Sequence, residues 1–179
     1  MSGHNKWSKV KHRKEATDAH KSKVFGKLAQ LIAVESRLAK GDAGAPSLAA
    51  IIAKARAVNM PQENIERAIK RGAGGEEAAL EAVTYEAYGP GGAALIIEAV
   101  TDNKNRAVAE IKHALSEHGG SLAAPGSALW AFKKTDTGWE PTTPLSLDEK
   151  TQIALAALVE ALEESDEVQA VYTNANFRA

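Results

Sequence analysis

The chain has 179 residues, of which 44% are hydrophobic and 25% are charged, a composition that suits one medium globular domain or two small ones. It contains no cysteine, which excludes disulfides, cysteine nucleophiles and cysteine-ligated zinc and makes a redox function unexpected. The net charge of −1 conceals two oppositely charged halves: residues 1–75 contain 15 Lys/Arg and 6 Asp/Glu (+9), and residues 76–179 contain 7 and 17 (−10).

The basic half predicts binding to a polyanion, because neutralising phosphate groups releases their condensed counterions whatever the charge of the whole molecule. A competing interpretation is that the two halves only attract each other. No apolar segment follows the basic N-terminus, and no run of about 18 apolar residues occurs anywhere in the chain. We therefore expect a cytoplasmic protein that has neither a secretory signal nor a membrane span.

Residues 1–15 offer little apolar material and predict a basic arm that becomes ordered on a partner. After the arm, apolar residues at steps of three and four predict helices over residues 17–40, 47–58 and 61–71. Gly41 is expected to stop the first helix, and Gly72 to end the third in a left-handed conformation. Arm and helices together predict a basic helical domain over residues 1–75.

Residues 76–179 predict a second, acidic α/β domain. The expected order is strands 83–88 and 93–100, a helix over 103–118, a strand over 128–132, a short strand around Trp139, a helix over 149–164 and a strand over 168–172. Asp102 or Asn103 is expected to cap the first of these helices and Asp148 the second, with Ile153 among the inward residues. The fold class is therefore α+β, a three-helix domain followed by a ferredoxin-like sandwich with its helices on one face of the sheet.

Motifs of catalysis and metal binding have simpler structural interpretations in this chain. The sequence Gly89-Pro90-Gly91-Gly92 lacks the Lys-Ser/Thr of a Walker loop and favours a hairpin turn. His4, His12 and His20 lie eight residues apart, a spacing that does not bring metal ligands together. No set of acid, base and nucleophile is recognisable, so we expect no enzyme, no metal, no cofactor and no small-molecule substrate.

The arm contains the strongest candidates for nucleic-acid contacts, Lys6-Trp7-Ser8-Lys9 and Lys11-His12-Arg13-Lys14. Cationic side chains bind phosphates, and an indole between them can stack on an exposed base. The alternative for this segment is a solubilising tail. The polar junction Thr101–Arg106 has two interpretations as well, since it can bind a phosphate at a helix N-terminus or only cap the helix.

Five blocks of sequence resemble motifs of the YebC family of probable transcriptional regulators and mitochondrial translational activators. They are MSGHNKWSKVKHRK at the start, the segments 59–70, 85–92 (YEAYGPGG) and 101–106 (TDNKNR), and 168–174 (VQAVYTN). The resemblance implies a helical domain followed by α/β domains, and a regulator that binds promoter DNA or, alternatively, acts on the ribosome as a translation factor bound to rRNA or tRNA. The nucleic-acid-binding residues that it implies are Lys6, Trp7, Lys9, Lys11, His12, Arg13, Lys14, Lys70, Arg71, Asn103, Asn105 and Arg106.

The chain departs from the family pattern at one place. Family members usually carry a further α/β domain between positions equivalent to about Phe132 and Trp139, where this chain has only residues 133–138. The resemblance therefore implies a shortened member without the third domain. The sequence does not choose between DNA and the ribosome, and a module whose acidic half docks a protein partner is the competing hypothesis from another class.

Overall fold

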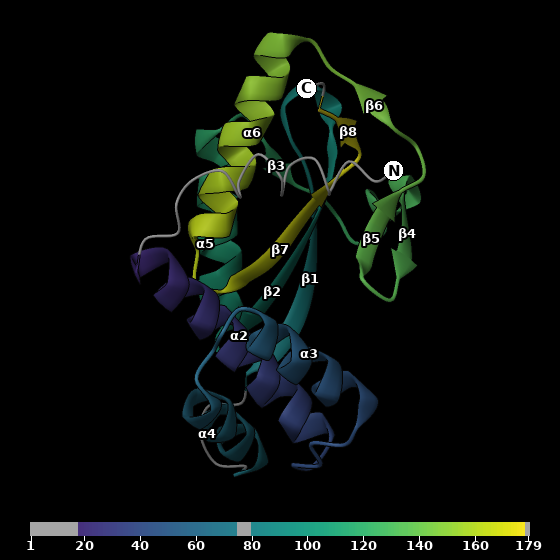
Figure 1. Ribbon diagram of the computed structural model, residues 1–179. Helices are drawn as coiled ribbons and strands as arrows, with labels where there is room; N and C mark the ends of the chain where they lie inside the picture. The colour runs from purple at the N-terminus through teal and green to yellow at the C-terminus, as the bar shows by residue number, and fades with distance from the viewer. Residues whose placement is uncertain (1–17, 75–79, 178–179) are drawn as a thin grey trace. The chain divides into compact units, whose positions relative to one another are not determined.

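The computed structural model describes residues 18–74 and 80–177, which divide into two compact units near Ala82 and Val83 (Figure 1). The first, called the helical unit below, contains α2 (Asp18–Leu38), α3 (Pro46–Ala57) and α4 (Gln62–Ala73). The second is called the sheet unit. Its elements are β1 (Glu81–Tyr88), β2 (Ala94–Thr101), α5 (Lys104–Glu117), β3 (Ser121–Leu122), β4 (Phe132–Thr135), β5 (Gly138–Pro141), β6 (Leu145–Ser146), α6 (Glu149–Glu164), β7 (Val168–Thr173) and β8 (Ala175–Asn176). The predicted α+β class, with helices first along the chain and a sheet domain after them, is confirmed.

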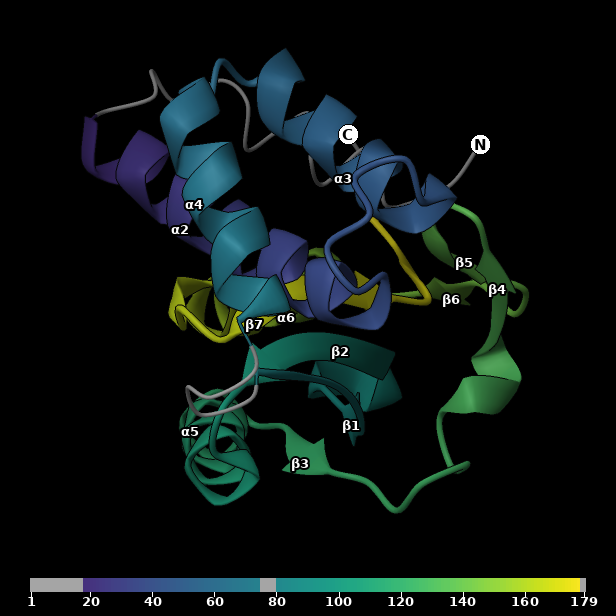
Figure 2. The same cartoon turned by 90° about the horizontal axis from the view of Figure 1, so that it is seen from below.

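The helical unit is held together by α2, which packs against both α3 and α4 (Figure 2). The three helices begin and end within two residues of the predicted positions. Apolar side chains fill the space between them, because each helix turns one stripe of its surface inward. The buried members are Ile32, Leu48, Ile52, Ala55, Met60, Ile65 and Ala68.

The prediction for Gly72 is wrong, because this glycine lies inside α4 and not in a left-handed cap. It is buried against α2, where an ideal Cβ would overlap the carbonyl oxygen of Ala33 and lie 2.8 Å from the Cβ of Ser36. Glycine therefore permits the close approach of the two helix backbones. The Ser36 hydroxyl donates a 2.7 Å hydrogen bond to the carbonyl of Ile69 at the same crossing. Gly41 does stop α2 as predicted, with φ of +82°.

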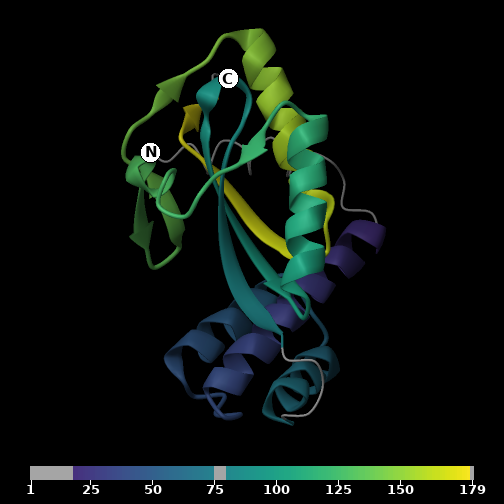
Figure 3. The ribbon, with the colours of Figure 1, turned by 180° about the vertical axis from the view of Figure 1, so that it is seen from behind.

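The sheet unit contains a four-stranded sheet in the order β3-β1-β2-β7, in which β3 is antiparallel to β1 and β7 is antiparallel to β2. Helices α5 and α6 cover one face of this sheet (Figures 1 and 3). Alternate residues of β2 point to opposite faces. Leu95 and Ile97 pack with the helices, whereas Ala94 and Ile96 belong to a second cluster on the other face.

Both predicted helix caps in the sheet unit are confirmed. The Asn103 side chain accepts a 3.1 Å hydrogen bond from the Arg106 backbone N–H, and the Asp148 carboxylate accepts a 2.8 Å bond from the Thr151 N–H. Hydrogen bonds from Thr151 to the charged form hold the pKa of Asp148 below its ordinary value. Ile153, expected to face the core, is instead 66% exposed on α6.

The predicted strand over residues 128–132 is wrong in most of its length, because Leu129–Ala131 form a 3₁₀ turn and only Phe132 enters β4. The competing interaction comes from Glu86 of β1, a buried carboxylate that accepts backbone N–H bonds from Gly126, Ala128 and Leu129. Burial by itself would raise the pKa of Glu86, but these three donors lower it below its ordinary value. Apolar composition alone did not indicate this turn.

The hairpin β4–β5 includes residues 133–138, the short interval at which we expected the inserted domain of the family pattern to be missing. Its strands are joined by the two residues Asp136 and Thr137, and it packs on the face of the sheet opposite the helices (Figure 3). Glu98 of β2 accepts hydrogen bonds from Trp139 Nε1 at 3.0 Å and from Lys134 Nζ at 3.2 Å, and the Lys134 ammonium lies 4.6 Å from the indole centroid. An ion pair and a hydrogen bond thus attach the hairpin to the sheet, and the cation–π contact joins the two strands of the hairpin to each other.

Candidate nucleic-acid interface

The structure divides the described candidate residues between the two units. Lys70 and Arg71 occupy the last turn of α4 in the helical unit, and both are exposed. Asn103, Asn105 and Arg106 lie where α5 begins in the sheet unit. The arm candidates Lys6, Trp7, Lys9, Lys11, His12, Arg13 and Lys14 lie outside the described residues.

The surface of α4 is polarised along its length. Glu63 and Glu66 lie in its first half, Arg67 follows at the middle of the helix, and Lys70 and Arg71 lie in its last turn. Arg67 Nη2 lies 3.4 Å from Glu63 Oε1, but both side chains are more than two-thirds exposed, so this pair contributes little to stability. The second half of α4 therefore presents a cationic surface to solvent.

The two units carry opposite net charges, as the two halves of the sequence do. Residues 18–74 contain 10 Lys/Arg and 5 Asp/Glu, a formal charge of +5, and residues 80–177 contain 6 and 15, a formal charge of −9. The helical unit is therefore basic and the sheet unit acidic.

The junction Thr101–Arg106 is engaged in structural contacts. The Asn103 side chain caps α5, as described above. Arg106 donates from Nε to Glu167 Oε1 at 3.1 Å and also pairs with the same oxygen through Nη2. Glu167 is buried and Arg106 is half exposed, so the guanidinium compensates a carboxylate that would otherwise be costly to bury. Asn105 remains an exposed polar residue at the same helix start.

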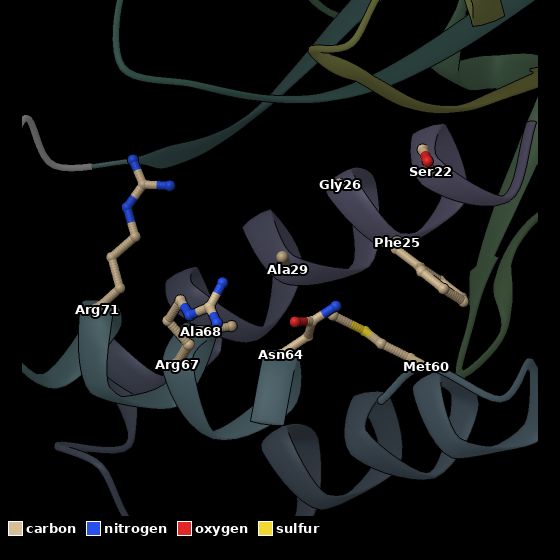
Figure 4. A pocket seen from close by; sticks show the side chains of 9 residues that line it. All are labelled: Ser22, Phe25, Gly26, Ala29, Met60, Asn64, Arg67, Ala68 and Arg71. Atoms are coloured by element: carbon tan, nitrogen blue, oxygen red, sulfur yellow. The ribbon is translucent and has the colours of Figure 1, made fainter. Parts of the chain in front are cut away.

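A pocket of about 360 Å³ lies between α2 and α4 (Figure 4). Each helix contributes residues at steps of three and four, so one stripe of each helix faces the hollow. Arg67 and Arg71 stand at one end, Phe25 and Met60 at the other, and Asn64 lies between them (Figure 4). The full lining is Ser22, Phe25, Gly26 and Ala29 from α2, Met60 before α4, and Asn64, Arg67, Ala68 and Arg71 from α4.

Small residues keep this pocket open. An ideal Cβ on Gly26 would meet nothing within 4 Å, and Ala29 and Ala68 add only methyl groups. Neither the Asn64 amide nor the Ser22 hydroxyl makes a hydrogen bond to another described residue. The pocket thus combines an apolar floor, an amide, a hydroxyl and two guanidinium groups.

Sequence reasoning found Arg71 but missed the rest of this pocket. The apolar periodicity over residues 17–40 predicts a helix but no pocket, and Gly26 and Ala29 carry no signal of their own. The pattern that could have found the site is the pair of matching stripes, Ser22-Phe25-Gly26-Ala29 and Asn64-Arg67-Ala68-Arg71, each at positions i, i+3, i+4 and i+7.

The described part of the chain offers neither a metal site nor a membrane span. Over residues 18–74 and 80–177, no group of three or more His, Asp and Glu residues is placed to hold a metal ion. No helix within the same ranges has the length and apolar character of a membrane span.

Two family models match the chain. The model described as the TACO1/YebC protein N-terminal domain matches residues 5–75. The model described as the TACO1/YebC second and third domain matches in two segments, residues 80–137 and 132–175. Together the two matches cover nearly the whole chain.

Curated relatives and a solved structure agree with these matches. A protein of Desulfosudis oleivorans is 46% identical over 175 residues, 97% of this chain and 71% of the relative, and one of Chlorobaculum tepidum is 47% identical over 169 residues, 93% of this chain and 67% of the relative. Both are named probable transcriptional regulatory proteins. The crystal structure of a conserved hypothetical protein from Aquifex aeolicus is 31% identical, with a TM-score of 0.83, and the match covers 90% of this chain and 93% of that one.

Proposed function

We propose, from the premise that the chain belongs to the TACO1/YebC family, that it is a nucleic-acid-binding regulator of gene expression whose helical unit and arm contact phosphates. A regulatory family is what the names of its relatives support. The first form of the proposal is a transcriptional regulator that binds DNA. The second is a ribosome-associated translation factor that binds RNA.

The observation that carries the proposal is the separation of charge. The described helical residues have a formal charge of +5 and the described sheet residues one of −9, although the whole chain is nearly neutral. Lys70 and Arg71 are exposed at the end of α4, where they can neutralise phosphates. A protein held together only by attraction between its halves would not need cations on an exposed helix end.

The polarity of α4 favours contact along a nucleic-acid backbone. A recognition helix enters the major groove with its N-terminal residues toward the bases. In α4 these residues include Glu63 and Glu66, whose carboxylates would be repelled by phosphates. The cations lie at the other end of the helix. A cationic helix end suits binding to irregular or single-stranded RNA at least as well as binding to duplex DNA. For this reason a ribosome-associated translation factor is the second candidate function.

We further propose that the chain is a shortened family member, with a basic helical domain over residues 1–75 and an acidic domain over 76–179. The family model for the second and third domains matches in two segments that overlap at residues 132–137, and the relatives are longer than this chain. The compact hairpin β4–β5 occupies this position. Binding through the helical unit does not require a third domain, and we further propose that the protein is cytoplasmic.

The proposal is tested by measuring binding of the full chain near physiological ionic strength. Labelled duplex DNA from promoter regions and single-stranded RNA are titrated in a fluorescence anisotropy assay, and association with ribosomes is measured by cosedimentation. The double variant Lys70→Glu/Arg71→Glu should weaken binding at least tenfold, because it replaces two cations by two anions.

The matched control is Lys112→Glu, a charge reversal at an exposed position of α5 in the sheet unit. It should bind like the unsubstituted protein. Tighter binding to promoter duplexes supports the transcriptional form, and cosedimentation with ribosomes supports the translational form. If the unsubstituted chain binds neither duplex DNA, nor single-stranded RNA, nor ribosomes, the proposed function is wrong.

A further inference from the structure

We propose that the pocket between α2 and α4 binds one unpaired nucleotide, with its base on the apolar floor and its phosphate on the two arginines. The inference rests on the proposed function and specifies the form of nucleic acid that the helical unit recognises. The ligand is a nucleotide of RNA or of single-stranded DNA whose base is not paired and stacked within a double helix.

The two ends of the pocket differ in the way that the two ends of a nucleotide differ. Phe25 and Met60 supply an aromatic ring and a polarisable thioether at one end (Figure 4). Arg67 and Arg71 supply planar guanidinium groups at the other end, and such groups match phosphate geometry. A base at the first end and a phosphate at the second would satisfy both sets of groups.

Asn64 lies between the two ends, where the edge of a bound base would lie (Figure 4). An amide side chain has both donors and an acceptor, so it can pair with the edge of a base. Its amide makes no hydrogen bond to another described residue. The Ser22 hydroxyl on the other side of the pocket also makes no hydrogen bond to another described residue, so it can bind a second polar atom of the ligand.

The size of the pocket suits a ligand of this class. Its volume of about 360 Å³ falls at the lower end of the roughly 300–1,000 Å³ typical of small-molecule sites. The space exists because Gly26, Ala29 and Ala68 leave it unfilled. A larger side chain at position 26 would cause neither backbone strain nor a clash at its Cβ, because φ of Gly26 is not positive and an ideal Cβ meets nothing within 4 Å.

Charge complementarity favours a nucleotide over an apolar peptide. A hydrophobic peptide side chain could cover the floor, but it would offer no acceptor atoms to the two guanidinium groups, whereas a phosphate offers several. Glu63 lies within 4 Å of Arg67 only as an exposed, weak pair, which a phosphate can replace. An anionic ligand with a planar apolar part is therefore the occupant that the lining selects.

The test is to fill the pocket without changing its charge. Gly26→Leu places an isobutyl group in the hollow, and Ala53→Leu at an exposed position of α3 is the matched control. Affinities are measured for the full chain with a short labelled single-stranded RNA, the single-stranded DNA of the same sequence, and the corresponding DNA duplex. Thermal unfolding of both variants shows that the helical unit still folds.

We expect Gly26→Leu to weaken binding of both single strands by about tenfold, the equivalent of ~1.4 kcal/mol and within the range for one stacked base. Duplex binding and the Ala53→Leu control should stay within twofold of the unsubstituted protein. Asn64→Ala, which leaves the floor intact, should change the preference among oligonucleotides that differ in one base.

The outcomes separate the two proposals. If Gly26→Leu folds and binds single strands as well as the control does, while Lys70→Glu/Arg71→Glu is impaired, the pocket inference is wrong and the proposed function stands. If Gly26→Leu fails to fold, Asn64→Ala decides by its effect on base preference. If the unsubstituted chain binds no nucleic acid, both proposals are wrong.

Discussion

The crossing of α2 and α4 gives the sharpest prediction about the fold, because it contains two helical glycines whose surroundings differ. At Gly72 an added methyl group would overlap the carbonyl oxygen of Ala33 and lie 2.8 Å from the Cβ of Ser36. At Gly26 the same methyl group would meet nothing within 4 Å. The substitutions Gly72→Ala and Gly26→Ala therefore make the same chemical change in different environments.

The expected effects have opposite signs. Gly26→Ala should stabilise the helical unit by about 0.5–1 kcal/mol, because alanine has the higher helix propensity. Gly72→Ala gains the same amount but must move one helix backbone, which costs roughly 1–3 kcal/mol or more by the general cost of overpacking. The movement also lengthens the Ser36 hydroxyl bond to the Ile69 carbonyl, worth about 1 kcal/mol. The net expectation for Gly72→Ala is a loss of about 2 kcal/mol.

Native-state hydrogen exchange is the suitable assay, because the chain has two compact units and a single unfolding transition cannot be assumed. Protection of the α2 and α4 amides should fall in Gly72→Ala and rise in Gly26→Ala, with the amides of β2 and β7 unchanged. Equal protection factors in the two variants would refute the claim that Gly72 permits a close helix approach.

Three further predictions concern the sheet unit. Backbone donors hold the pKa of Glu86 below its ordinary value. The stability that the Glu86 carboxylate contributes is therefore present above the unfolded-state pKa and is lost as the pH falls through the folded-state pKa. Glu86→Gln should lower the free energy of unfolding, measured by denaturant titration, by about 2–4 kcal/mol at neutral pH and by less in acid. Gly138→Ala should destabilise the β4–β5 hairpin by about 1–3 kcal/mol, since φ is +131° and an added Cβ would lie 2.7 Å from Tyr172 Cζ, and a loss of near-ultraviolet circular dichroism would report it. Arg106→Ala should cost about 3 kcal/mol by leaving the buried Glu167 carboxylate without its guanidinium, whereas Arg106→Ala/Glu167→Gln should recover more than half of that loss in the same titration.

Local patterns in the sequence were enough to predict most elements of the fold. Periodic apolar residues placed three helices to within two residues, and the side chains of Asn103 and Asp148 marked the caps of α5 and α6. These signals are local, since a helix period and a cap are set by residues a few positions apart. The two-residue strands β3, β6 and β8 gave no such signal, because so short a segment has no measurable period.

Interactions between distant segments explain the errors. Gly72 was assigned to a cap because glycine after basic residues commonly ends a helix, and only the position of Ala33 on another helix shows why glycine is required inside α4. The turn at Leu129–Ala131 follows from Glu86, more than 40 residues away, which binds the backbone there. The paired stripes that form the pocket become visible only when α2 and α4 are placed side by side.

The dependence of affinity on salt tests most directly whether the helical unit binds a phosphate backbone. The logarithm of the binding constant is plotted against the logarithm of the KCl concentration for the unsubstituted chain, for Lys70→Ala/Arg71→Ala, and for Lys112→Ala as the control. If Lys70 and Arg71 neutralise phosphates, the double variant should have a slope that is shallower by about 1.4–1.8, two contacts at roughly 0.7 each for single strands or 0.9 each for duplex DNA. Equal slopes for all three proteins would contradict a phosphate interface on the helical unit.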